Sequence, residues 1–295
     1  MTFFNLSELS RQHFTPCVLY MVATPIGNLA DISARALAGF SCADVVCAED
    51  TRVASRLLRA YGIQANIANV REHNEQLMSK KVCQWLHEKK IVIYLSDAGT
   101  PAFSDPGARL AEAVWQAGFR VSAVPGACAA AAAWSISGMN ETQFLFAGFL
   151  PTKRATRSLY LARYERADYS VMCYEAPHRI ERFLSDLVEV LGATRPIIMI
   201  REMTKIFETV LRMPAGELLD FVKKDTNQQR GEITLIICPM PLATLDNSLD
   251  EETCRIVKIL MPHMSVKQVA QLTHQITGFS KKKLYDFALK LHQLP

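Results

Sequence analysis

The chain has 295 residues, of which 49 % are apolar, so it exceeds one small domain and can bury a substantial core. Its 33 basic and 29 acidic side chains give a net charge of +4, which permits a polyanionic partner without requiring one. No apolar stretch has the length of a membrane span or a signal peptide, so we expect a cytoplasmic protein without a membrane partner. The eight cysteines form no C-x-x-C pair, which is typical of reduced, buried thiols and disfavours a zinc site.

The first part of the chain alternates strand-like and helix-like segments. Apolar runs predict strands, and helical spacing predicts helices between them. The predicted strands are 17–24, 43–50, 91–96 and 119–124, and the predicted helices are 30–40, 51–62, 78–90 and 106–118. Gly62 and Gly118 are expected to end helices and Gly39 to lie near the end of one, whereas Asp105 and Pro106 are expected to cap and begin one. This alternation favours βαβ units and a mostly parallel sheet.

The same pattern restarts after Pro125-Gly126. Further helices are predicted over 129–137, 155–165, 179–192 and 215–224, and further strands over 144–150, 170–176, 196–202 and 232–239. We therefore expect an α/β protein with a flexible leader at 1–16, one domain at 17–126 and a second at 127–241, although the turn at Leu150-Pro151 is a rival boundary. Residues 242–295 are expected to form a polar linker and a helical hairpin, whose first helix opens with a Ser265–Gln268 capping box and ends at Gly278.

The loop SDAGTPAFSDPG, residues 96–107, follows a predicted buried strand. Asp97 lies at the carboxyl end of that strand, where open α/β sheets bind ligands, so we expect Asp97 to face a ligand and Asp105 to be structural. Gly99 would allow close approach to the backbone. The alternative is that both aspartates only cap turns. Neither a P-loop nor a G-x-G-x-x-G pattern occurs, so a nucleotide-like ligand would not be held in the Rossmann manner.

Five polar clusters also lie at predicted strand ends. They are AEDTR (48–52), REHNE (71–75), YEAPHR (174–179), REMTK (201–205) and GEIT (231–234). Each alone is compatible with an exposed, salt-bridged loop, but together they favour a shared cleft. No D-x-D spacing supports magnesium, and we expect no metal site.

The order of ATPIGNLADIS, AEDTR, SDAGTPAFSDPG, VPGACAA, YEAPHR, REMTKIFE and GEITL resembles the tetrapyrrole methylase family, the class III S-adenosylmethionine methyltransferases. Within it the chain is most similar to members that act on small-subunit ribosomal RNA. The resemblance covers about Leu19 to Ile237, and the C-terminal segment SKKKLYDFAL also fits. It departs from the family pattern at Ala23, where proline is expected, and at Ala127, where proline often follows Pro-Gly.

The resemblance implies two α/β domains with S-adenosyl-L-methionine in the cleft between them, usually in a homodimer. The implied reaction is 2′-O-ribose methylation of a cytidine in the decoding region of 16S ribosomal RNA, with the rRNA or ribosomal subunit as partner. Alternatives are methylation of a tetrapyrrole (corrinoid) intermediate, a non-catalytic RNA-binding assembly factor, and a magnesium-dependent phosphotransferase.

The resemblance and the residue chemistry together define candidate site residues. The cofactor would contact Pro25, Asp97, Gly99, Thr100, Cys128, Ala129, Tyr174, Glu232 and Ile233. The catalytic candidates are Glu175, His178, Glu202 and Lys205, with Glu49 and Arg201 also considered. Two basic segments are expected to grip RNA phosphates, namely Lys153, Arg154 and Arg157, and Lys281, Lys282 and Lys283.

Overall fold

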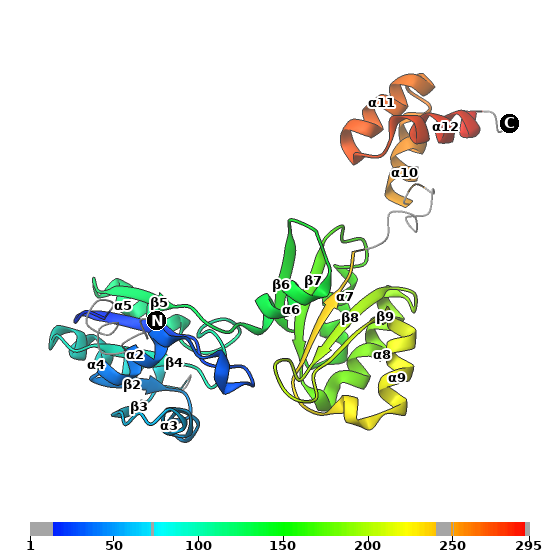
Figure 1. The fold of residues 1–295 in the computed structure, drawn as a ribbon. Coiled ribbons are helices and arrows are strands. Elements are labelled where there is room, and N and C mark those ends of the chain that lie inside the picture. Colours follow the sequence, from blue (N-terminus) through cyan, green and yellow to red (C-terminus); the bar gives the residue numbers. More distant parts are fainter. Residues whose placement is uncertain (1–13, 72–73, 240–248, 250, 293–295) are drawn as a thin grey trace, which may run out of the picture. The chain divides into compact units, whose positions relative to one another are not determined.

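A computed structural model describes residues 14–71, 74–239, 249 and 251–292. The chain forms two compact units, Met1–Pro239 and Met240–Pro295 (Figure 1). Most of the predicted leader and of the polar linker lies outside the described residues. The last residues of the leader do belong to the fold, because the Phe14 side chain is buried against Tyr20 with ring centroids 4.7 Å apart.

The first sheet is entirely parallel, as predicted. Its order is β3-β2-β4-β1-β5, and every pairing is parallel. The strands are β1 (Val18–Val22), β2 (Val45–Ala48), β3 (Ile67–Asn69), β4 (Val92–Leu95) and β5 (Arg120–Val124). The central strands β2 and β4 are buried along their whole length, because helices and side chains cover both faces of the sheet.

Four helices and a 3-10 turn accompany this sheet. They are η1 (Leu29–Asp31), α2 (Ala34–Cys42), α3 (Thr51–Ala60), α4 (Glu75–His87) and α5 (Ala108–Gln116). Helix α2 begins after Ser33, whose hydroxyl accepts from the Ala36 N–H, and Gly39 lies near its end, as expected. Gly39 is a packing position, since a Cβ there would lie 2.6 Å from the Phe14 ring. Gly62 and Gly118 do follow helices, with φ of 71° and 79°.

The start of α5 corrects the expectation for Asp105. The N-cap residue is Gly107, with φ of 121°, and the helix begins at Ala108. A Cβ at residue 107 would lie 2.7 Å from the Tyr94 ring, so both the backbone conformation and the space favour glycine. The Asp105 side chain is therefore not used as the cap of this helix.

The second sheet is mixed, which corrects the expectation of mostly parallel pairing. Its order is β6-β7-β10-β8-β9, and only β6 and β7 are parallel. The strands are β6 (Phe144–Phe149), β7 (Ser170–Glu175), β8 (Pro196–Arg201), β9 (Thr209–Pro214) and β10 (Ile233–Ile237). Strand β9 was not predicted, and it turns back directly along β8 after the loop 202–208.

Helices cover both faces of the second sheet. Helix α6 (Ala129–Ser137) has the predicted bounds and packs with Met172, Ile198 and Ile236 on one face. The alternate residues of the same strands face a larger core with the remaining helices. Those helices are α7 (Arg154–Ala162), α8 (Ile180–Leu191) and α9 (Ala215–Lys224), with the 3-10 turns η2 (Pro177–Arg179) and η3 (Thr226–Gln229).

The C-terminal unit contains three helices among its described residues, where a hairpin of two was predicted. They are α10 (Glu251–Leu260), α11 (Val266–Thr277) and α12 (Lys281–His292). The missed helix is α10, whose acidic start reads as part of a polar linker but whose Val257 side chain is fully buried in the core of this unit. The predicted capping box of Ser265 and Gln268 is confirmed, as is Gly278 at the end of α11 with φ of 74°.

All eight cysteines are free, and each is buried or half-buried. In the described part of the chain, no helix combines the length and the apolarity that crossing a membrane requires.

Candidate functional site

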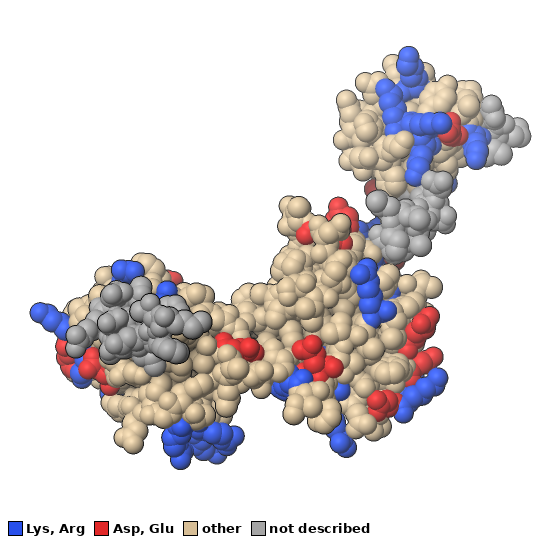
Figure 2. Space-filling model, in the orientation of Figure 1, with Lys and Arg blue, Asp and Glu red and all other residues tan. Residues whose placement is uncertain are grey.

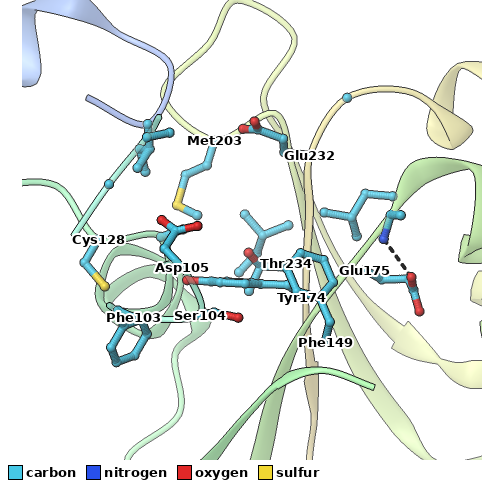
Figure 3. A pocket seen from close by; sticks show the side chains of 18 of the residues that line it. Phe103, Ser104, Asp105, Cys128, Phe149, Tyr174, Glu175, Met203, Glu232 and Thr234 are labelled. Atoms are coloured by element: carbon cyan, nitrogen blue, oxygen red, sulfur yellow. Dashed lines mark hydrogen bonds between the residues drawn. The ribbon is translucent and has the colours of Figure 1, made fainter. Parts of the chain in front are cut away.

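A cavity of about 350 Å³ lies within the first unit, where loops that follow the strands of the first sheet meet the second sheet (Figure 3). Its walls are mostly apolar, with a few polar groups that include Thr100, Asp105 and Glu232. This size and composition are typical of small-molecule sites. The lining residues are Ile26, Ala98, Gly99, Thr100, Phe103, Ser104, Asp105, Cys128, Ala129, Phe149, Tyr174, Glu175, Ala176, Pro177, Ile200, Met203, Gly231, Glu232, Ile233 and Thr234.

Three loops of the first sheet are tied together at this cavity. Gly99, with φ of 74°, exchanges two backbone hydrogen bonds with Thr24, at 2.9 and 3.0 Å. The Thr100 hydroxyl donates to the Ala127 carbonyl oxygen at 3.1 Å. This hydrogen bond uses only the backbone of Ala127. Ala23 packs closely against Gly126, since a Cβ added at Gly126 would lie 3.0 Å from the Cβ of Ala23. Small residues at both departures from the family pattern are therefore compatible with the loops' geometry.

Tyr174 joins the second sheet to the start of α6. Its hydroxyl oxygen accepts a hydrogen bond from the Ala130 N–H at 3.1 Å, and burial raises the pKa of the phenol. The Phe146 ring packs edge-on against Tyr174 and stacks on Phe103, with centroids 5.1 and 4.4 Å apart. The aromatic contacts thus join the 98–105 loop to β6 and β7.

The two aspartates of the 96–107 loop occupy places that differ from those predicted. Asp105 lines the cavity, and Figure 3 shows its carboxylate on the side of Tyr174. Burial and the charge of Asp97 raise the pKa of Asp105, against a hydrogen bond from Ser96 that lowers it. Asp97 is exposed, does not line the cavity and accepts a hydrogen bond from the Asp50 N–H at 3.2 Å. Sequence reasoning missed Asp105 because Asp-Pro is such a common helix opening.

Glu175 contributes to the cavity wall, but its carboxylate is already bound. It accepts from the Ala176 N–H at 2.7 Å and pairs with the Arg179 guanidinium at 3.0 Å. Burial raises the pKa of this carboxyl, and the two partners oppose that shift. Figure 3 shows the carboxylate pointing away from Asp105 and Tyr174. His178, in η2, is exposed and does not line the cavity.

Glu202, Lys205 and Glu232 form one ion-pair cluster. The Lys205 ammonium lies 2.8 Å from the Glu202 carboxylate and 3.2 Å from that of Glu232, and Glu202 also accepts from the Glu232 N–H at 2.9 Å. Burial alone would raise the pKa of Glu202, but the hydrogen bonds from Lys205 and the Glu232 backbone lower it. The predicted clusters 201–205 and 231–234 are thus in contact, although only Met203 and residues 231–234 line the cavity.

Two of the predicted polar residues, Arg201 and Arg157, are buried among hydrogen-bonding partners and stabilise the fold. Arg201 is buried and donates to Gln228, Thr209 and the Arg230 and Phe207 carbonyls. Arg157, predicted to bind RNA, is buried in an ion pair with Asp186 and donates to the carbonyls of Pro151 and Thr152. The expectation for Arg157 is wrong, because a guanidinium enclosed in this way cannot reach an RNA phosphate.

The other predicted cationic residues are on the surface. Lys153 is exposed, and Arg154 is exposed while paired with Asp186 and Glu189. Lys281, Lys282 and Lys283 are exposed in the first turn of α12, and Figure 2 shows basic side chains gathered on the C-terminal unit.

A third cationic surface was not predicted. Arg52, Arg56 and Arg59 are exposed along one side of α3, where Figure 2 shows a group of basic side chains. The spacing i, i+4, i+7, readable in TRVASRLLRA, is the signal that could have revealed it. Arg52 pairs with Asp50 at 2.7 Å, and both groups lie at the end of α3 that follows β2.

The predicted cofactor contacts are largely brought together. The cavity is lined by Gly99, Thr100, Cys128, Ala129, Tyr174, Glu232 and Ile233, whereas Pro25 is buried beside it and Asp97 is exposed outside it. The apolar lining of Ile26, Phe103, Phe149 and Met203 was not predicted, because hydrophobic residues in loops have no distinctive spacing. Among the described residues, no group of three or more His, Cys, Asp or Glu could hold a metal ion.

Two family models match the chain. The model of the Tetrapyrrole (Corrin/Porphyrin) Methylases matches residues 18–219, and that of the RsmI C-terminal HTH domain matches residues 247–292. Together they cover most of the first unit and the three C-terminal helices.

Solved structures of low sequence identity share the fold. A cobalamin biosynthetic enzyme, cobalt precorrin-4 methyltransferase, has a TM-score of 0.56 at 15 % identity, covering 80 % of this chain and 98 % of that one. Uroporphyrin-III-C-methyltransferase from Thermus thermophilus has a TM-score of 0.52 at 18 % identity, covering 74 % and 93 %.

Curated relatives are much closer in sequence. Proteins named ribosomal RNA small subunit methyltransferase I are 46 % identical in Neisseria meningitidis serogroup B, 40 % in Pseudomonas aeruginosa and 39 % in Escherichia coli O157:H7. The matches cover 92 % of this chain and 92 %, 96 % and 94 % of the respective relatives. The chain therefore belongs to the tetrapyrrole methylase family and, within it, to the group of ribosomal RNA small subunit methyltransferase I proteins.

Proposed function

We propose that this protein transfers a methyl group from S-adenosyl-L-methionine to small-subunit ribosomal RNA, at the ribose 2′-hydroxyl of a cytidine in the decoding region. The observation that carries the proposal is the mostly apolar cavity bounded by the family's own motif loops. The names of the close relatives support the RNA substrate. The cytidine and the 2′-oxygen are inferred from the resemblance of the motifs.

The residues of the cavity fit this cofactor. Its volume of about 350 Å³ suits a single nucleoside-sized ligand, and the side chains of Ile26, Phe103 and Met203 offer apolar contact for an adenine ring. The carboxylates of Asp105 and Glu232 complement positive charge, and the start of α6 at Cys128 and Ala129 complements a carboxylate. When bound, the cofactor supplies a methyl group that is already activated by the sulfonium.

The chain's own task is then to place the ribose oxygen and remove its proton. Correct placement lowers the barrier by about 7–11 kcal/mol in well-oriented reactions, and a general base raises the rate by a further factor of about 10²–10⁴. Glu175 and Glu202 are held in ion pairs and His178 lies outside the cavity, which disfavours three of the predicted catalytic residues. We assign proton acceptance to Asp105, whose carboxyl lines the cavity and whose pKa is raised.

Lys205 is a candidate to stabilise developing negative charge. Its ammonium is 3.2 Å from Glu232, a residue of the cavity wall, so a shift of that ion pair would present the cation to the substrate.

The RNA is proposed to be held through its phosphates by exposed cations. These are Lys153 and Arg154 at the start of α7, the arginine row of α3, and Lys281–Lys283 of α12. Arginine suits this role because its guanidinium makes paired hydrogen bonds to phosphate oxygens. We also propose that the protein acts in the cytoplasm as a homodimer, for which the exposed Leu145 of the edge strand β6 provides apolar surface.

The test is methyl transfer from labelled S-adenosylmethionine to small ribosomal subunits that lack the modification, followed by mapping of the label. A single 2′-O-methylcytidine in the decoding region is the expected result. Label on another nucleotide contradicts the assigned target. No label on RNA, together with methylation of a corrinoid precursor, would replace this proposal with tetrapyrrole methylation.

A further inference from the structure

The loop 202–208, between β8 and β9, presents two large apolar side chains to solvent. Ile206 is 95 % exposed and Phe207 is 72 % exposed, and in the described part of the chain they are the two most exposed side chains of this kind. Large apolar side chains that are held in water without partners mark binding surfaces. The question is what this pair would bind.

The loop is held in place by its own polar contacts. Lys205 pairs with Glu202, the Thr204 N–H donates to the Glu208 carboxylate at 2.6 Å, and Arg201 donates to the Phe207 carbonyl at 3.2 Å. Glu202 and Thr204 have φ of 52° and 68°, a left-handed conformation that non-glycine residues adopt only at a cost. Ile206 and Phe207 are therefore displayed by an anchored loop that does not fold them inward.

The loop adjoins the cavity on two sides. Met203 lines the cavity, and Lys205 pairs with Glu232, which also lines it. On the other side, Lys205 packs against the loop that follows β1, since a Cβ at Gly27 would lie 2.7 Å from its side chain. A group bound on Phe207 would thus be held by the same loop that contributes Met203 to the cavity wall.

We propose that Phe207, with Ile206 beside it, is a stacking platform for one unpaired base of the RNA substrate. The inference rests on the proposed function and names a specific contact for it. An exposed aromatic face on a loop that borders the cavity suits an unstacked base, because single-stranded RNA is recognised largely by stacking on such rings. The apolar patch consists only of Ile206 and Phe207, between the charged Lys205 and Glu208. Two side chains are too small a surface for a stable protein interface, which needs about 800 Å² per partner.

The test compares Phe207→Leu, which removes the ring but stays apolar, with Phe207→Trp, which keeps an aromatic face. Leu77→Ala, at a 71 % exposed residue of α4, is the matched control. Methyl transfer to small ribosomal subunits that lack the modification gives KM and kcat separately, and calorimetry gives S-adenosylmethionine affinity. We expect Phe207→Leu to raise KM for subunits about 5- to 150-fold without changing cofactor affinity. Phe207→Trp and Leu77→Ala should stay close to the wild type.

A second measurement separates this inference from the proposed function. Fluorescence of Phe207→Trp, with the wild-type signal of its three tryptophans subtracted, should be quenched by single-stranded oligocytidine RNA. If the wild type methylates no subunits, the proposed function fails and the quenching alone decides the platform.

The platform is wrong if Phe207→Leu leaves KM unchanged, or if no quenching occurs. It is also wrong if Phe207→Leu converts a dimer to a monomer in sedimentation while RNA affinity is unaffected, because the patch would then belong to a contact with a second copy.

Discussion

Asp97 and Asp105, eight positions apart in one loop, have different surroundings, and the difference decides which of them can do chemistry. Both residues are exposed, but Asp105 lines the cavity, whereas Asp97 does not line it and accepts from the backbone of Asp50. A residue's place after a buried strand indicates the edge of the sheet at which it lies. It does not indicate the direction of its side chain, which the turn between Gly99 and Gly107 determines.

The first prediction concerns these aspartates. Asp105→Asn should lower kcat by about 10²-fold or more if Asp105 accepts the proton, because the amide cannot do so. Since burial raises its pKa above the usual 3.8, the wild-type rate should rise with pH as this carboxyl ionises, and the step should vanish in the variant. Steady-state kinetics against pH, with Asp97→Asn as the control, measure both effects. A larger loss in Asp97→Asn than in Asp105→Asn would contradict the assignment.

The second prediction concerns the stability provided by Glu202. Its folded-state pKa lies below 4.5, so the ionised carboxylate stabilises the folded protein above pH 4.5, and this contribution is lost as the pH falls through the folded-state pKa. Glu202→Gln should lower the free energy of unfolding by about 1–3 kcal/mol at neutral pH, with a smaller difference in acid. Urea denaturation across pH checks this, with the exposed Glu112→Gln as control. A difference that is independent of pH would exclude the ion pair as its cause.

At the scale of elements, α3 combines a packing face with a cationic one. Ala54 and Leu58 are buried in the core, while Arg52, Arg56 and Arg59 share the exposed side. Like charges at i, i+3 and i+4 destabilise a helix by about 0.2–0.5 kcal/mol per pair, so this row is not explained by helix stability. A polyanionic partner provides a physical reason for it.

The third prediction therefore replaces all three arginines of α3 with glutamine. The logarithm of subunit affinity plotted against the logarithm of salt concentration should lose about two to three units of slope, because up to three phosphate contacts disappear. Thermal unfolding should be unchanged or slightly improved. The control is Lys223→Gln with Lys224→Gln on α9, which removes two exposed cations from another helix. An equal loss of slope in both proteins would mean that only net charge matters.

At the scale of the whole molecule, the two compact units have separate cores. The C-terminal core is formed by Val257, Val269, Ala270, Leu284 and Ala288, together with partly buried residues of the same unit. The cavity is formed by residues of the first unit alone. We therefore expect that the affinity for the cofactor does not depend on the C-terminal helices.

The fourth prediction follows from this separation. A chain that ends at Pro239 should fold and bind S-adenosylmethionine with the affinity of the full chain, as measured by calorimetry, while its KM for ribosomal subunits rises. Replacing Lys281–Lys283 with glutamine in the full chain should reproduce part of that rise. A truncated protein that unfolds or loses cofactor affinity would show that the first unit depends on the C-terminal helices.

Elements with local signals could be predicted from the amino-acid sequence. Helix α6 has its predicted bounds, Gly62 and Gly278 follow helices, and the apolar strands of the first sheet are parallel as the alternation indicated. These features depend on hydrophobic period, capping and glycine conformation, which act over a few residues. The order of motifs was enough to identify the family.

Features that depend on partners distant in the sequence could be seen only in the folded protein. The insertion of β10 antiparallel between β7 and β8 is set by long-range pairing, and nothing within EITLIICP specifies the direction of a neighbour. Arg157 has the sequence context of an exposed basic helix, but Asp186 of α8 and two carbonyls enclose it. Asp105 enters the cavity because Gly107, packed on Tyr94, takes the place of the helix cap. Local patterns determine which residues form elements, and the packing of those elements determines which side chains remain free to react.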